Sequence, residues 1–228
     1  MSILASELIY NIKNLKGGGI QSDDENLSDR QLYFIINYYR AKLVRQEVQR
    51  HGVIPPEMVQ DLGKVNLITA DPHECDCPAE ACVLRTELKL PNTLLLAGKK
   101  HGLTFAGMYG CMGWQETTWQ AGPWTMFSKY TGKNTKWLLK GNYMYILNPS
   151  DPMLSYMNIQ GLFEDPLEAT KFRTCDCDNG EDCIEGFDFP YPISSHMVDT
   201  LTKMIMDNEI RWSSLIPEDT ANDSLDSN

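Results

Sequence analysis

The stretch LSDRQLYFIINYYRAKLVRQEVQRHG, residues 27–52, decides the fold because it encodes a long helix with two defined ends. Ser28 is followed three residues later by Gln31, which is the pattern of a capping box at a helix start. Gly52 is typical of the residue just after a helix, and the two prolines at residues 55–56 prevent continuation. We therefore predict one uninterrupted helix between Ser28 and Gly52.

This predicted helix carries two apolar faces. The first face consists of Leu32, Ile35, Ile36, Tyr39 and Leu43, and the second of Phe34, Tyr38, Ala41, Val44 and Val48. A helix on the surface of a monomer needs only one apolar stripe. Two stripes predict burial on two sides, either by other elements of this chain or by a neighbouring subunit, and both alternatives remain open. The candidate interface residues are Leu32, Phe34, Ile35, Tyr38, Tyr39 and Leu43.

Helices are also predicted near both ends of the chain. Residues 3–15 place Leu and Ile at helical spacing, and the three glycines at residues 17–19 end that helix. Asp165 followed by proline opens a short helix. A last helix begins after Ser194 or Ser195.

The middle of the chain has the pattern of strands and turns. Its clearest feature is a hairpin, in which the runs at residues 136–140 and 143–147 flank Gly141-Asn142. Both turn residues tolerate a positive φ, as a two-residue hairpin turn requires. Residues 83–96 and 154–163 also predict strands.

These elements predict an α+β fold, in which a helical bundle from the N- and C-terminal helices holds an inserted antiparallel β domain. We expect N-terminal helices over residues 1–56 and the β domain over residues 57–165. Residues 166–212 are expected to form C-terminal helices that pack with residues 1–56. Residues 213–228 are rich in acidic and small polar residues, which predicts a flexible tail or a docking arm.

Composition narrows the possible functions. The chain of 228 residues has a net charge of -11, and such a surface disfavours tight binding to duplex DNA. No apolar run reaches the roughly 18 residues that span a bilayer, and residues 1–15 lack the pattern of a signal peptide. We therefore expect synthesis and assembly in the cytoplasm. The odd count of seven cysteines argues against a disulfide framework.

Two cysteine clusters invite a metal hypothesis. Each has a Cys-x-Cys pair with a third cysteine five or six residues later: Cys75, Cys77 and Cys82, and Cys175, Cys177 and Cys183. Thiolates bind Zn²⁺ tetrahedrally, but Cys-x-Cys is not the usual knuckle spacing, and acidic neighbours raise thiol pKa values. Bound zinc, disulfides and reduced thiols therefore remain three alternatives.

No catalytic arrangement is recognisable in the sequence. The four histidines are not placed against a nucleophile and an acid, and the glycine-rich segments lack the lysine of a phosphate loop. We expect no enzyme and no cofactor apart from the possible zinc. The competing hypotheses are a zinc-dependent enzyme and a zinc-stapled adaptor that binds a host protein.

Several stretches together resemble a family of virion ring proteins from crAss-like phages. They are residues 27–47, PEMVQDLG at 56–63, CVLRT at 82–86, KLPNT at 89–93, YMNIQGLFEDP at 156–166 and FPYPIS at 189–194. This family is similar to the tail adaptor, or tail tubular protein A, of other short-tailed phages.

The resemblance implies a structural subunit in the virion neck. Such subunits form a ring of about a dozen copies, a homododecamer, that joins the portal to the tail. The implied partners are other copies of the chain, the portal protein and other tail ring or nozzle proteins. The implied ring lines the ejection channel, through which the genome passes without sequence-specific binding.

Overall fold

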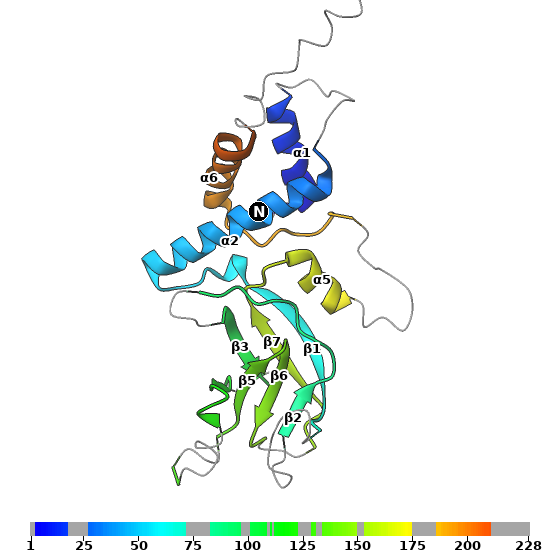
Figure 1. Cartoon of the computed structure of the whole chain (residues 1–228), viewed down its shortest axis with the longest axis vertical. Coiled ribbons are helices and arrows are strands. Elements are labelled where there is room, and N and C mark those ends of the chain that lie inside the picture. The colour runs from blue at the N-terminus through cyan, green and yellow to red at the C-terminus, as the bar shows by residue number, and fades with distance from the viewer. Residues whose placement is uncertain are drawn as a thin grey trace, which may run out of the picture. The chain divides into compact units, whose positions relative to one another are not determined.

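The computed structural model describes residues 3–17, 27–71, 83–96, 101–108, 110, 112–122, 129–130, 134–149, 153–174 and 186–210. The chain divides into two compact units. Met1–Val53 and Phe187–Asn228 form the first, which we call the helical unit, and Ile54–Gly186 form the second, which we call the sheet unit. Figure 1 shows the helices and strands of both, and the predicted mixed α+β class is confirmed.

The helical unit contains α1 (Ala5–Lys16), α2 (Asp29–His51), α6 (Ser195–Ile205) and the π-helical turn η3 (Met206–Ile210). α2 contacts both α1 and α6. The segment that precedes α6 returns to the start of the chain, because Ala5 N donates to Phe189 O (3.0 Å) and Tyr191 N donates to Ile3 O (2.9 Å). Two segments that are distant in sequence therefore build this unit together.

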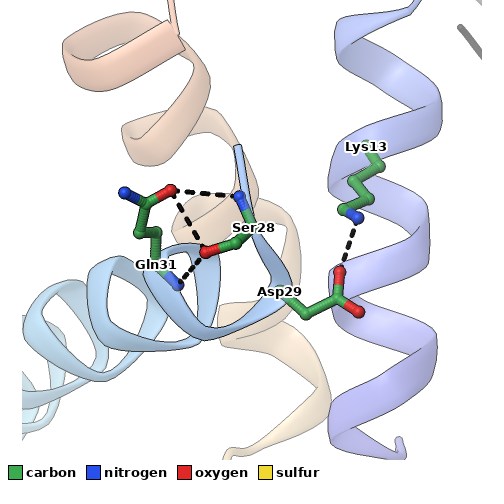
Figure 2. A network of polar contacts seen from close by, with 4 residues as sticks. All are labelled: Lys13, Ser28, Asp29 and Gln31. Carbon is green, nitrogen blue, oxygen red and sulfur yellow. Dashed lines mark hydrogen bonds and ion pairs between the residues drawn. The ribbon is translucent and has the colours of Figure 1, made fainter. Parts of the chain in front are cut away.

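Both ends of α2 form as the sequence predicts. Gln31 N donates to Ser28 Oγ (3.3 Å), and Ser28 N donates to Gln31 Oε1 (3.0 Å), so the capping box is present. Figure 2 shows this network together with the ion pair between Asp29 and Lys13 of α1. Gly52 ends the helix with a φ of 68°. Local sequence thus determines both boundaries of α2.

Within the described residues, the sheet unit holds a seven-stranded sheet. Its strands are β1 (Gln60–Thr69), β2 (Val83–Thr86), β3 (Leu103–Gly107), β4 (Gln115–Glu116), β5 (Lys136–Lys140), β6 (Tyr143–Leu147) and β7 (Tyr156–Gly161). Their order is β3-β7-β1-β2-β6-β5-β4. The short 3₁₀ helix η1 (Pro56–Met58) precedes β1.

The long strand β1 joins the two halves of this sheet. Its first part pairs with β7 and its last three residues pair with β2. The pairing with β7 shifts between Asp61 and Lys64, where Gly63 has a φ of 72°. Gly63 N also donates to Asp61 Oδ1 (2.8 Å), so a glycine bulge bends β1 near its start.

The predicted hairpin is confirmed, but the sheet is mixed and not purely antiparallel. β5 and β6 pair across Gly141 and Asn142, whose φ values are 60° and 67°. β4 pairs with β5 in parallel. A parallel pair needs a long connection, and residues 117–135 provide one. The two-residue polar strand β4 has no apolar alternation that the sequence analysis could have detected.

The helix α5 (Pro166–Thr174) lies in the sheet unit, where it contacts β1. Gln60 Nε2 of β1 donates to Pro166 O (3.0 Å), and Ala169 is buried in the core of the sheet. Residues 166–212, which were expected to pack with residues 1–56, are therefore divided between the two units. α5 packs on the sheet, whereas α6 belongs to the helical unit.

Candidate functional site

The exposed side of α2 carries two large aromatic side chains. Phe34 is 72% exposed and Tyr38 is 60% exposed, and they lie one helical turn apart. An open depression of about 500 Å³ adjoins Phe34 and is lined also by Leu27 and half-buried Ile35. A single exposed aromatic residue is ordinary, but neighbouring ones beside an apolar depression are typical of an interaction surface.

The predicted interface residues therefore fall into two groups. Leu32, Tyr39 and Leu43 are buried, with 0%, 5% and 7% of their surface exposed. Phe34 and Tyr38 face outward, and Ile35 lies at the boundary. The outward group is the part of the set that a partner can reach without any rearrangement of α2.

The opposite side of α2 is fastened by the segment that precedes α6. The Tyr33 ring lies 4.8 Å from the Phe187 ring, measured between centroids. Tyr191 donates from its hydroxyl to Asn37 Oδ1 (2.7 Å), and the buried Arg40 guanidinium lies 5.7 Å from the Tyr191 ring. These contacts fix the rotation of α2 about its axis. They therefore determine which side chains point outward.

A further contact joins α2 to the end of the described chain. Tyr39 donates from its hydroxyl to Glu209 Oε1 of η3 (2.8 Å). Burial, together with the hydrogen bond and the charge of Glu209, raises the pKa of Tyr39 to about 12. The Tyr38 ring lies 5.3 Å from the Tyr39 ring, so the contact with Glu209 lies next to one of the two exposed aromatic side chains.

Charge on α2 differs from the charge of the chain as a whole. α2 has five Lys and Arg residues but only two acidic residues, although the chain carries a net charge of -11. Asp29 pairs with Lys13, and Glu47 Oε1 lies 3.5 Å from His51 Nε2 and 3.7 Å from His196 Nε2. The acidic side chains of α2 are thus engaged with α1, α6 and the end of α2.

Three of the four exposed basic residues of α2 share a side with its exposed aromatic residues, and the fourth, Arg50, lies on another side. At 100° per residue, the set on the shared side falls within about a third of the helix circumference. We call it the aromatic-basic face, and it consists of Arg30, Phe34, Tyr38, Lys42 and Arg45, all exposed. Such a face suits a partner that offers apolar and acidic groups together.

The sheet unit has a cavity of about 300 Å³ between β1 and α5. Burial, and next the charge of Asp165, raises the pKa of Glu168 in its wall. The lining consists of Lys64, Val65, Asn66, Glu87, Leu88, Glu168, Lys171 and Phe172. It includes no histidine, cysteine or serine.

The six cysteines of the metal hypothesis, Cys75, Cys77, Cys82, Cys175, Cys177 and Cys183, lie outside the described residues. Among the residues that the structure does describe, no three His, Cys, Asp or Glu side chains are grouped as a metal site would require. None of the helices within the described ranges has the length and apolar character needed to cross a membrane.

Residues 7–227 match the family model described as phage tail ring protein 2. The match spans nearly the whole chain and includes segments of both units. A search of curated proteins found no match.

Proposed function

Because the chain belongs to the phage tail ring protein 2 family of crAss-like phages, we propose that it forms the connector ring that joins the portal to the tail. The family establishes a structural ring protein of the virion tail. The place next to the portal is our proposal, and it is supported by the similarity of the family to the tail adaptors of short-tailed phages. Those adaptors also suggest about a dozen copies in the ring.

The aromatic-basic face of α2 is the proposed contact between neighbouring subunits. Adjacent subunits in a ring touch through two different patches, so each subunit needs an outward surface that its own core does not use. Phe34 and Tyr38 provide such a surface, and large aromatic side chains are frequent anchors of interfaces. This outward pair is the observation that carries the proposed interface.

The acidic character of the chain suits a channel through which DNA must move. A net charge of -11 disfavours adhesion to the phosphate backbone, because no excess of Lys and Arg is available to replace counterions. We propose that the ring lines the ejection channel and binds no specific sequence. This structural role requires no catalytic site.

Zinc analysis and thiol titration of the purified chain separate the three proposed states of the six cysteines.

Cryo-electron microscopy of the virion neck tests the proposal. We expect a ring of this chain that touches the portal, with α2 of each subunit at a boundary between copies. A ring located elsewhere in the tail would contradict the portal position but not the interface. A ring whose boundaries leave Phe34 and Tyr38 exposed would contradict the interface.

A further inference from the structure

The last described residues of the chain end close to the aromatic-basic face. Glu209 of η3 accepts the hydrogen bond of Tyr39, and the Tyr39 ring contacts the Tyr38 ring. Residue 213 follows four positions after Glu209, a reach of about 13 Å when extended. The C-terminal segment, which we define as residues 213–228, is therefore attached to the chain four residues beyond a side chain that contacts Tyr39.

The chemistry of this C-terminal segment complements the face. Its sequence, SSLIPEDTANDSLDSN, has four acidic residues and no basic residue. It also contains the apolar residues Leu215, Ile216 and Leu225. The face offers the converse, with exposed aromatic rings at Phe34 and Tyr38 between basic residues. Opposite charges and apolar groups can then be matched along one helix.

The dimensions also agree. Arg30 and Lys42 are twelve residues apart on α2, which corresponds to about 18 Å along the helix. Sixteen residues reach about 50 Å when fully extended, so the C-terminal segment can run along the whole face. A short tether keeps an attached segment at an effective concentration of about a millimolar. The C-terminal segment of the same chain should therefore bind the aromatic-basic face in preference to the C-terminal segment of another copy.

We propose that residues 213–228 of each chain lie on the aromatic-basic face of α2 in the free subunit. The inference rests on the proposed interface, because it assigns to that surface an occupant that a neighbouring subunit must displace. The C-terminal segment shields Phe34 and Tyr38 in the free subunit and delays association between copies. When the ring forms, the segment leaves α2 and becomes available to other neck proteins.

Competition binding on the full-length chain tests the proposal. The probe is a fluorescein-labelled peptide with the sequence of residues 213–228. The proteins are the natural chain and a chain with a neutralised tail, E218Q/D219N/D223N/D226N. We expect the peptide to bind the neutralised chain about tenfold or more tightly than the natural chain, as measured by fluorescence anisotropy. Added salt should weaken this binding, because exposed charges contribute to it.

Two further variants of the neutralised chain locate the site. Phe34→Ala should abolish the gain in peptide affinity, whereas Tyr130→Ala should leave the gain unchanged. Tyr130 is a matched control because it is 86% exposed and lies in the sheet unit. Circular dichroism verifies that each variant is folded.

Three results of the peptide titrations would each overturn the inference. They are equal peptide binding by the natural and neutralised chains, binding that Phe34→Ala does not reduce, and absence of binding to the neutralised chain. Dilution of the natural chain gives a further test. If dilution removes its resistance to peptide binding, the inference is also overturned, because the segment on the face would then belong to another copy. Ring assembly is measured in a separate experiment. If the peptide results contradict this inference but Phe34→Ala still blocks ring assembly, the proposed subunit interface remains supported.

Discussion

Individual side chains of α2 determine which side of this helix packs against the rest of the helical unit and which side faces outward. Tyr33, Asn37 and Arg40 make the contacts to the segment before α6, although none of them belongs to the two apolar stripes visible in the sequence. Phe34 and Tyr38 were predicted as interface residues together with residues that are buried. The sequence could not separate the two groups, because the side that is buried is selected by residues about 150 positions away.

Phe34→Ala tests the proposed interface at a single side chain. Because Phe34 is 72% exposed, its removal should change the free energy of unfolding by less than about 0.5 kcal/mol. Loss of an anchor should weaken association between subunits by about 2 kcal/mol, or roughly 30-fold. Incorporation of the variant into phage particles, measured by mass spectrometry, gives the result. Normal incorporation at the level of a Tyr130→Ala control would contradict the interface.

The pair of Tyr39 and Glu209 predicts a pH dependence of stability. Unfolded tyrosine ionises near pH 10, whereas the pKa of Tyr39 in the folded chain is about 12. The folded state therefore retains the proton between these values, and its stabilisation is complete below pH 10 and lost as the pH rises through 12. Absorbance of tyrosinate should show a late titration component that Tyr39→Phe removes.

Glu209→Gln is the companion variant for this titration. It removes the carboxylate charge but retains a side-chain oxygen that can accept the hydrogen bond from Tyr39. The pKa of Tyr39 should then move down toward its ordinary value, because one of the causes of its rise is removed. An unchanged late titration in Tyr39→Phe would show that another tyrosine is responsible.

Elements with strong local signals were predictable, whereas those that depend on distant pairing were not. The ends of α2 and the turn of the hairpin between β5 and β6 follow from a few adjacent residues. The parallel pairing of β4 and the packing of α5 on β1 depend on partners far along the chain. Phe172 of α5 packs against the core of the sheet, which the sequence alone could not distinguish from packing on the other helices.

Ser28→Ala should destabilise the start of α2. The substitution removes the oxygen that accepts from Gln31 N, and the loss of such a cap costs about 1 kcal/mol. Ser194→Ala is the comparison variant, because Ser194, although buried, occupies the same position before α6 without a side-chain cap hydrogen bond. Denaturant unfolding should show a clearly larger loss for Ser28→Ala. Equal losses in the two variants would mean that the capping box contributes nothing measurable.

At the scale of the whole molecule, the family assignment confirms the resemblance to crAss-like phage ring proteins. The mixed fold class was also predictable, because helical and strand periodicities occupy separate parts of the chain. The division of the chain into two units was harder to predict from the sequence. The sheet unit is one continuous segment, Ile54–Gly186, whereas the helical unit is assembled from two.

This difference predicts that only the sheet unit folds when it is excised. A fragment of residues 54–186 should retain its sheet and unfold cooperatively, because the core residues of the sheet all lie within it. A fragment of residues 1–53 should be largely unfolded, since it lacks α6 and the aromatic partners of Tyr33, and isolated helices are marginal in water. Circular dichroism and NMR dispersion of the two fragments give the answer. A stably helical fragment 1–53 would contradict the prediction.

The split construction of the helical unit has a consequence for biosynthesis. Translation at roughly 5–20 residues per second places residues 187–205 outside the ribosome about 8–30 s after α2 has emerged. During that interval the sheet unit can fold, while Tyr33, Asn37 and Arg40 await the residues that later hold them. A chain that terminates between residue 186 and α6 contains the whole sheet unit but only part of the helical unit. We therefore expect truncated translation products that lack residues 187–205 to leave α2 without the contacts that fix its orientation.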